Sequence, residues 1–233
     1  MSKMVQLDWS GQKILLFPVT RNRRVLALSE TDRRDIPTDV RQWITPSDCW
    51  EIREAAETHI QNNKVVVAGR DSTDPLNYDL RARLCWDYLA DHFNYKPDGS
   101  KDLWQFPSET LALKHGDCED LAILLASLLM VSGISSYCVR VVIGDLSIGT
   151  SSKGSHAWVV YKNEQGDWCI LDATLKPEEL PEAGTWHIAN EWALTGKDRT
   201  YRPKWCFNQH HAWSIDSKII EWSPELYTPV VQP

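Results

Sequence analysis

The chain has 233 residues, of which 42% are hydrophobic and 24% are charged, the proportions of a globular protein rather than of a disordered or fibrous one. Its formal net charge of −7 disfavours a nucleic-acid-binding role, because neutralising phosphate groups requires a basic surface. No apolar run approaches the ~20 residues of a membrane-spanning helix, and residues 1–9 lack the apolar segment of a signal peptide. We therefore expect a cytoplasmic protein that binds neither nucleic acid nor membrane.

Two N-terminal segments and two helices precede the central part of the chain. Apolar and polar residues alternate over 12–19 and 23–28, around polar residues 20–22, which predicts a β-hairpin. A helix is expected to begin near 45–48, with one apolar face, and a second helix is expected over 78–93. The apolar face of the first helix consists of Cys49, Ile52, Ala56 and Ile60.

The next element is a buried helix that begins with a cysteine. Gly116 and Asp117 precede Cys118, and an Ala/Leu-rich run then continues to Val131. Asp117 is placed to be the N-cap, with Asp120 as the third helical residue of a capping box. The positive end of a helix lowers the pKa of a thiol, whereas three neighbouring carboxylates raise it. A nucleophilic cysteine at this position therefore needs a base from elsewhere in the chain.

A predicted hairpin supplies that base. Residues 154–161 and 167–174 have the composition of strands, joined by a polar, glycine-containing turn. If the hairpin is symmetric about residue 164, His156 lies opposite Asp172, with Cβ atoms roughly 4.5–5.5 Å apart. A thiol, an imidazole and a carboxylate would then meet, as attacking group, general base and orienting group.

The remaining residues carry weaker patterns. A helix is expected near 186–192 and one or two strands within 200–222. We expect three parts in one compact unit: an N-terminal β-hairpin extension at 1–45, a core at 46–175 and a C-terminal extension at 176–233 packed on the core. The six cysteines show no CxxC spacing, so we expect free thiols and no structural zinc site.

The three motifs together resemble the transglutaminase-like, papain-related cysteine enzymes, and most of all their bacterial and archaeal branch, the transglutaminase-like cysteine proteinases. The resemblance runs from about Asp79 to Thr174. It implies an α+β, papain-like fold in which the nucleophile helix packs on an antiparallel sheet. It also implies that Cys118 is the nucleophile, His156 the base and Asp172 its partner.

The same resemblance indicates two further features. Members of this family complete an oxyanion hole with a tryptophan or glutamine upstream of the cysteine, and Trp104 and Gln105 both fit, since both side chains carry N–H donors. The Asp-Cys-Glu-Asp run is also similar to that of calcium-dependent periplasmic proteases. We expect no cofactor to be required, because Asp117, Glu119 and Asp120 also favour a helix N-terminus; a calcium site formed by these three residues is the alternative.

The function expected is thiol-dependent acyl transfer on an amide bond of a protein or peptide substrate, by a cysteine peptidase or isopeptidase acting through a thioester. One alternative is a protein-glutamine transglutaminase or deamidase, which uses the same thioester. Another is a catalytically silent structural or assembly protein, such as a component of a phage-like particle, that binds partners through a surface rich in the chain's twelve tryptophans. The sequence does not define the oligomeric state.

Overall fold

The computed structural model describes the chain in segments, namely residues 5–9, 12–21, 36–44, 49–61, 66–67, 69–71, 74, 76–99, 103–149, 154–182, 184–188, 193–194 and 199–214. The predicted strand at 23–28 and the predicted helix start at 45–48 lie outside these residues. Among the helices in the described segments, none is long and apolar enough to cross a membrane.

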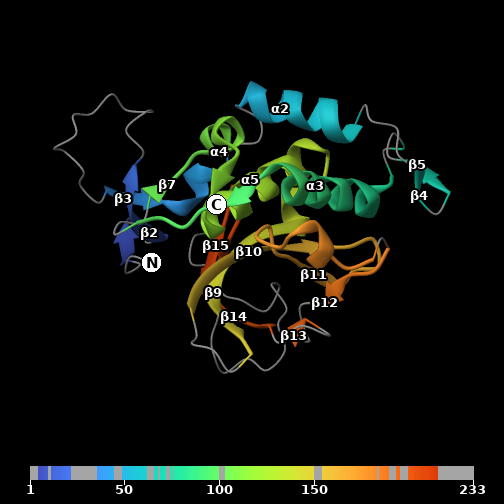
Figure 1. Cartoon of the computed structure of the whole chain (residues 1–233). Coiled ribbons are helices and arrows are strands. Elements are labelled where there is room, and N and C mark those ends of the chain that lie inside the picture. The colour runs from blue at the N-terminus through green and yellow to red at the C-terminus, as the bar shows by residue number, and fades with distance from the viewer. Residues whose placement is uncertain are drawn as a thin grey trace.

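An antiparallel sheet of seven strands forms the lower layer of the molecule in Figure 1. Its order is β12-β11-β10-β9-β14-β13, and β15 also pairs with β14. The strands are β9 (Val139–Ile148), β10 (Gly154–Lys162), β11 (Trp168–Leu171), β12 (His187–Ile188), β13 (Ala193–Leu194), β14 (Arg199–Phe207) and β15 (Ala212–Ser214). β9 and β10 are buried over most of their length.

A helical layer covers one face of this sheet (Figure 1). The α-helices are α2 (Trp50–Ala56), α3 (Tyr78–His92), α4 (Pro107–Leu113) and α5 (Cys118–Val131). A π-helical turn (Glu57–Gln61) extends α2, and 3-10 turns occupy Val40–Trp43, Ser136–Cys138 and Pro177–Glu179. α5 packs against β9, β10 and the other three helices, and every residue from Cys118 to Leu129 is buried. The helices predicted at 78–93 and from Cys118 to Val131 are confirmed, as is the α+β fold class.

The N-terminal strands form a separate sheet. β1 (Val5–Trp9), β2 (Gln12–Arg21) and β3 (Ile36–Asp39) are antiparallel, and β7 (Leu103–Trp104) pairs with β2 in parallel. Trp9 pairs with Gln12, so the hairpin turn lies between β1 and β2. The turn predicted at 20–22 is wrong for Thr20 and Arg21, because both continue β2 and pair with β7. The N-terminal sheet is thereby joined to the segment that leads to Gln105.

Two short ladders complete the described elements. β4 (Val66–Val67) pairs with β5 (Arg70–Asp71), and β6 (Asn94–Tyr95) pairs in parallel with β8 (His115–Gly116). The second ladder lies immediately before α5. The N–H of Asn94 donates to the carbonyl of Lys114 at 3.0 Å, and the N–H of Lys96 donates to that of Gly116 at 2.8 Å.

Residues beyond 175 contribute strands to the sheet that carries His156. β12 pairs with β11 at residues 187 and 188. The helix predicted near 186–192 is therefore wrong at these two residues. The strands predicted within 200–222 are present as β14 and β15. β14 lies beside β9, with Tyr201 opposite Leu146 and Pro203 opposite Gly144. The sheet therefore combines strands that precede residue 175 with strands that follow it.

Candidate active site

The first turn of α5 is held by the carboxyl group of Asp120. Asp117 is the N-cap, as predicted, and its backbone N–H donates to Oδ2 of Asp120 at 3.3 Å. Oδ1 of Asp120 accepts from the backbone N–H of Gln105 at 2.7 Å. Burial raises the pKa of Asp120 well above its ordinary value, with a further contribution from the charge of Asp117. Asp120 thus fastens the helix start to the segment that precedes α4.

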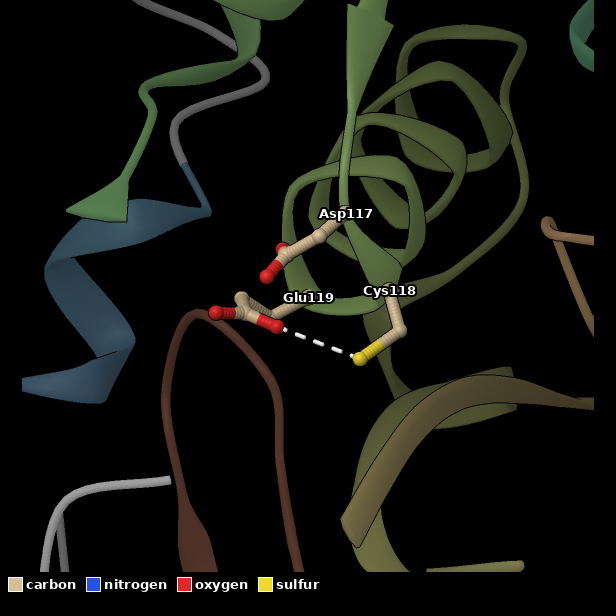
Figure 2. A group of neighbouring side chains, drawn as sticks. All are labelled: Asp117, Cys118 and Glu119. Atoms are coloured by element: carbon tan, nitrogen blue, oxygen red, sulfur yellow. Dashed lines mark hydrogen bonds between the residues drawn. The ribbon is translucent and has the colours of Figure 1, made fainter. Parts of the chain in front are cut away.

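The Cys118 thiol lies at the beginning of α5 and faces a carboxylate. Figure 2 shows Sγ directed at Glu119, and the thiol donates to Oε2 of Glu119 at 3.2 Å. Burial raises the pKa of Cys118 well above its ordinary value, and the charges of Glu119 and Asp117 raise it further, while a backbone hydrogen bond from Ala157 lowers it. At neutral pH this cysteine is therefore a protonated thiol in the arrangement seen here.

His156 and Asp172 are in direct contact, as predicted, but not as a cross-strand pair. Nε2 of His156 lies 2.9 Å from Oδ2 of Asp172. β10 and β11 pair Lys162 with Trp168, so the hairpin is symmetric about residue 165 rather than 164. β11 ends at Leu171, and Asp172 is the first residue after the strand. The predicted register is thus wrong, and the contact forms because the carboxylate at the strand end reaches the imidazole.

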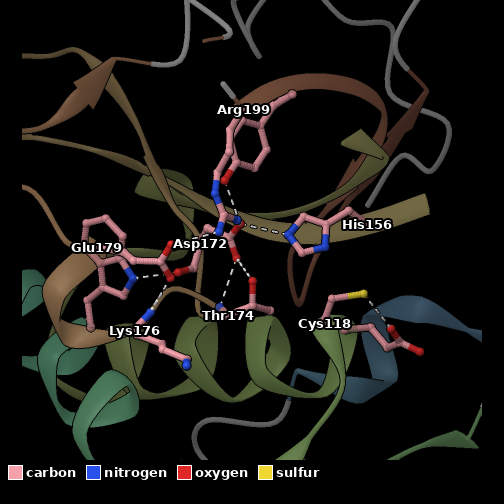
Figure 3. Close-up of polar contacts among 10 residues, drawn as sticks. Cys118, His156, Asp172, Thr174, Lys176, Glu179 and Arg199 are labelled. Carbon is pink, nitrogen blue, oxygen red and sulfur yellow. Dashed lines mark hydrogen bonds and ion pairs between the residues drawn. The ribbon is translucent and has the colours of Figure 1, made fainter. Parts of the chain in front are cut away.

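The carboxylate of Asp172 is fully buried and accepts several hydrogen bonds (Figure 3). Oδ2 accepts from the hydroxyl of Tyr201 at 2.6 Å, while Oδ1 accepts from the hydroxyl and backbone N–H of Thr174 at 2.7 and 3.0 Å. Burial alone would raise the pKa of Asp172, but the charge of His156 and these hydrogen bonds hold it well below its usual range. The group is consequently an ionised acceptor that fixes the imidazole.

The sequence did not predict the roles of Thr174 and Glu179 in this network, nor those of two residues on β14. Tyr201 donates to Asp172 directly, and Nη1 of Arg199 lies 3.9 Å from the same carboxylate oxygen. Arg199 is itself held by Glu179, whose Oε1 lies 3.1 Å from Nη2. Tyr201 and Arg199 both lie on β14, and the sequence signal was limited to a predicted strand in that region, with nothing to show that it would lie next to β9.

The thiol and the imidazole approach each other across the boundary between the two layers. The backbone hydrogen bond from Ala157 places Sγ beside the residue that follows His156. Figure 3 shows the imidazole on β10, with Asp172 on one side of the ring and Cys118 toward the other. Within the described residues no hydrogen bond joins Cys118 to His156, and Nδ1 of the imidazole has no hydrogen-bond partner there. The structure thus brings the predicted residues Cys118, His156 and Asp172 together, and only Nε2 of the imidazole is hydrogen-bonded among the described residues.

Trp104 and Gln105 are the two candidates for the oxyanion hole. Trp104 is completely buried, and its ring centroid lies 5.7 Å from that of Trp43. Gln105 is 8% exposed, and its Oε1 has no hydrogen-bond partner in the part of the chain that the structure describes. Since the backbone of Gln105 is bonded to Asp120, its side chain starts close to the first turn of α5. Both side chains are thus buried, and Gln105 is the candidate whose backbone is held at the first turn of α5.

The carboxylates beside the thiol are candidate metal ligands. Ligand atoms of Asp117, Cys118 and Glu119 lie within 4.8 Å of one another (Figure 2). This group offers carboxylate oxygens from two residues only, whereas Ca²⁺ takes six to eight oxygen ligands. Asp120 is not part of the group, and both of its oxygens accept backbone N–H bonds. The geometry is compatible with a cation held by Asp117 and Glu119 together with further oxygen ligands, whereas Asp120 lies outside the group.

Comparison with known proteins gives one family. Residues 67–173 match the model of the transglutaminase-like superfamily. Among solved structures, the chain is similar to Legionella pneumophila LapG in an EGTA-treated form (TM-score 0.45, 18% identity, covering 76% of this chain and 90% of LapG). It is also similar to calcium-bound LapG (TM-score 0.44, 21% identity, covering 75% and 92%). A candidate cysteine protease from Cytophaga hutchinsonii is a third similar structure (TM-score 0.40, 16% identity, covering 98% and 81%).

The comparison with curated protein sequences gave no match. The family match includes Cys118, His156 and Asp172 and ends before β14. The resemblance inferred from the three motifs is thus confirmed, and residues 67–173 are the part of this chain that matches the transglutaminase-like superfamily.

Proposed function

We propose that the protein is a cysteine peptidase or isopeptidase that uses Cys118 as nucleophile, His156 as base and Asp172 as orienting group. One observation carries the proposal. A fully buried, ionised carboxylate holds Nε2 of His156 at 2.9 Å, and Nδ1, which has no partner among the described residues, lies toward a cysteine at a helix N-terminus (Figure 3). Holding one ring nitrogen fixes the tautomer and orientation in which the other can accept a proton.

The reaction proceeds in two acyl-transfer steps. Nδ1 of His156 takes the thiol proton as Sγ of Cys118 attacks the amide carbonyl carbon, and the tetrahedral oxyanion forms. The C–N bond then breaks, His156 returns the proton to the leaving amine, and a thioester remains. Water attacks the thioester, again with His156 as proton acceptor. The C–S bond then breaks, the acid product leaves, and His156 returns the proton to Sγ of Cys118.

The resting contact with Glu119 opposes the first step. While the thiol donates to Oε2 of Glu119, its proton is directed away from His156. In the proposed first step, rotation about the Cα–Cβ bond of Cys118 replaces the hydrogen bond to Glu119 with one to Nδ1 of His156. The observed hydrogen bond at 3.2 Å thus corresponds to a resting state that substrate binding must convert.

The proposed oxyanion hole consists of the backbone N–H of Cys118 and the side-chain amide of Gln105. Donors directed at a developing oxyanion in a buried site lower the barrier, and removal of one typically costs about 10²–10³ in kcat. Gln105→Ala is therefore expected to lower kcat strongly, whereas Trp104→Phe should act mainly through packing against Trp43.

The two alternative functions differ in what supports them. A transglutaminase or deamidase uses the same thioester with another acceptor or substrate, and the geometry of the three residues is equally suited to it. The assembly role requires a tryptophan-rich surface. Of the tryptophans whose side chains the structure describes, Trp50 is exposed, whereas the others are buried or half-buried, so the described surface offers no tryptophan-rich patch.

The experiment that tests this proposal is a substrate screen with matched variants. Wild type, Cys118→Ala and His156→Ala are incubated with an unfolded protein, an isopeptide-linked peptide pair and a glutamine peptide with a labelled amine, each with calcium or with a chelator. Hydrolysis by wild type that both variants lose supports the peptidase, and amine incorporation instead of cleavage supports the transglutaminase. Hydrolysis that survives in Cys118→Ala would contradict the assignment.

A further inference from the structure

Tyr95 lies next to the nucleophile and plays no part in the mechanism above. It is the second residue of β6, and its Cα partner in β8 is Gly116, two residues before Cys118. The flanking backbone bonds, from Asn94 to Lys114 and from Lys96 to Gly116, fix this position on both sides. The ring is therefore placed beside the start of α5 by a hydrogen-bonded ladder and not by a loose loop.

The side chain of Tyr95 is available for an external partner. This side chain is 52% exposed, although tyrosine is a large aromatic residue. None of the described residues forms a hydrogen bond or ring contact with it. By contrast, Tyr88, Tyr161 and Tyr201 each donate, accept or stack within the protein. An exposed aromatic ring fixed next to a nucleophile is a typical wall of a substrate cleft.

Acidic groups lie close to this ring. Burial, followed by the nearby Cys118, Asp117, Glu119 and Asp172, raises the pKa of Tyr95 to about 12. The phenol therefore stays neutral throughout the working pH range. Of the described cations, Lys114 donates to Tyr88 and Arg199 is paired with Glu179, while the exposed Lys96 follows Tyr95 directly in the chain.

An aromatic face beside carboxylates favours a cation. A lysine or arginine side chain over such a ring gains from the ring quadrupole, and nearby negative charge adds to the attraction. An acidic side chain at the same place would be repelled. The net charge of −7 has the same effect at longer range, since it favours the approach of basic substrates.

We propose that Tyr95 is a specificity-determining residue of the proposed peptidase, and that its ring holds a lysine or arginine side chain of the substrate next to the bond that Cys118 attacks. This inference rests on the proposed function and names its substrate class: a basic peptide segment. The ring, rather than the hydroxyl, makes the contact. The contact is made in binding, so it acts on the recognition of the substrate and not on the proton transfers of His156.

The test uses three thiol-reactive chloromethyl ketones that are identical except for a lysine, norleucine or glutamate side chain next to the ketone. The rate constant for alkylation of Cys118 is measured by peptide mass spectrometry in wild type, Tyr95→Phe, Tyr95→Ala, Tyr137→Ala and His156→Ala. Tyr137 is a matched control because it is an exposed tyrosine on the 3-10 turn before β9, away from Cys118. Using the ratio of lysine to norleucine rates within each variant cancels any change in the reactivity of the thiol.

In wild type the lysine probe is expected to react fastest and the glutamate probe slowest. Tyr95→Ala should lower the lysine-to-norleucine ratio by about threefold, the size of an exposed cation–π contact, whereas Tyr95→Phe and Tyr137→Ala should preserve it. A wild-type ratio near one, or a ratio that Tyr95→Ala leaves unchanged, would overturn the inference. Failure of the proposed function gives a different result: no probe would then react with Cys118 in a manner that depends on His156.

Discussion

Burial and the neighbouring carboxylates determine the protonation of the proposed nucleophile, Cys118. Burial, the charge of Glu119 and the charge of Asp117 all favour the neutral thiol. A helix N-terminus alone would favour the thiolate. Because the burial and the charges outweigh the helix, the thiol does not ionise by itself and needs a base at the moment of attack.

Glu119→Gln is expected to make Cys118 more reactive. Glutamine keeps the size of the side chain and removes the charge, so the pKa of the thiol should fall. Its alkylation by iodoacetamide at pH 7.5 should become about three- to tenfold faster, given that one pKa unit is a tenfold change in thiolate. The pH profile of labelling measures this shift. Glu54→Gln, an exposed change on α2, is the control, and equal rates in wild type and Glu119→Gln would refute the role of the carboxylate.

Tyr201→Phe separates orientation of the base from stability of the fold. The change removes the hydroxyl that donates to Asp172 at 2.6 Å. A hydrogen bond to a charged group contributes about 1.5–3 kcal/mol, so the free energy of unfolding should fall by that order. A drop in kcat with little change in KM should accompany it, because Asp172 loses one of the donors that hold it in place.

Tyr161→Phe is the matched control for this prediction. Tyr161 is also buried, and its hydroxyl also donates to a carboxylate, that of Asp79, at 2.8 Å. Urea unfolding should show similar losses of stability for the two variants, while only Tyr201→Phe should reduce kcat. Equal effects on kcat would mean that the Tyr201 hydroxyl has no specific part in orienting Asp172.

At the scale of the elements, the junction of β9 and β14 determines whether Tyr201 reaches the site. Gly144 of β9 lies opposite Pro203, next to an irregularity in the register of β14. A Cβ at position 144 would lie 2.1 Å from the carbonyl oxygen of Arg202. The close approach of the two backbones thus requires glycine at this position.

Gly144→Ala is expected to lower the free energy of unfolding by about 1–3 kcal/mol or more, because the clash is with backbone atoms that cannot move aside cheaply. It should also reduce kcat, since β14 carries Tyr201 and Arg199. Gly154→Ala in β10 is the control, because a Cβ there would meet nothing within 4 Å. Thermal melting and peptide cleavage check both points, and a Gly144→Ala variant with wild-type stability would contradict the packing described here.

The parts of the site that could be predicted from sequence are those with local signals. The N-cap at Asp117, the apolar run of α5 and the polar turn between β10 and β11 are each fixed by neighbouring residues. The predicted register of β10 and β11 differs from the observed one by two residues. The reason is that the end of β11 depends on tertiary pairing and not on the turn alone. Tyr201 lies 29 residues beyond Asp172, and only the position of β14 beside β9 connects them. No local pattern encodes that contact.

For the whole molecule, the buried charge of Asp172 makes stability depend on pH. The folded-state pKa is held below the unfolded value of about 3.9, so Asp172 contributes stability above that pH, and this contribution is lost as pH falls toward the folded-state value. The difference in unfolding free energy between wild type and Asp172→Asn should therefore be largest near pH 7 and should shrink below about pH 4.

Urea unfolding at several pH values measures this difference, with Asp87→Asn as a control of opposite sign. Burial raises the pKa of Asp87, so wild type should gain stability relative to Asp87→Asn as pH falls. A difference between wild type and Asp172→Asn that grows toward low pH would show that the buried carboxylate is not held ionised by its partners.

The central claim is that His156 activates Cys118, and the most direct measurement is iodoacetamide labelling of all six cysteines in wild type and His156→Ala. Burial raises the pKa of Cys85, Cys169 and Cys206 to about 12, so these thiols provide internal references of low reactivity. We predict that Cys118 is labelled faster than these three at pH 7.5, and that His156→Ala slows its labelling by about tenfold or more, toward the rate of the references. Labelling of Cys118 that is no faster than that of the buried references, and unchanged by His156→Ala, would contradict the account.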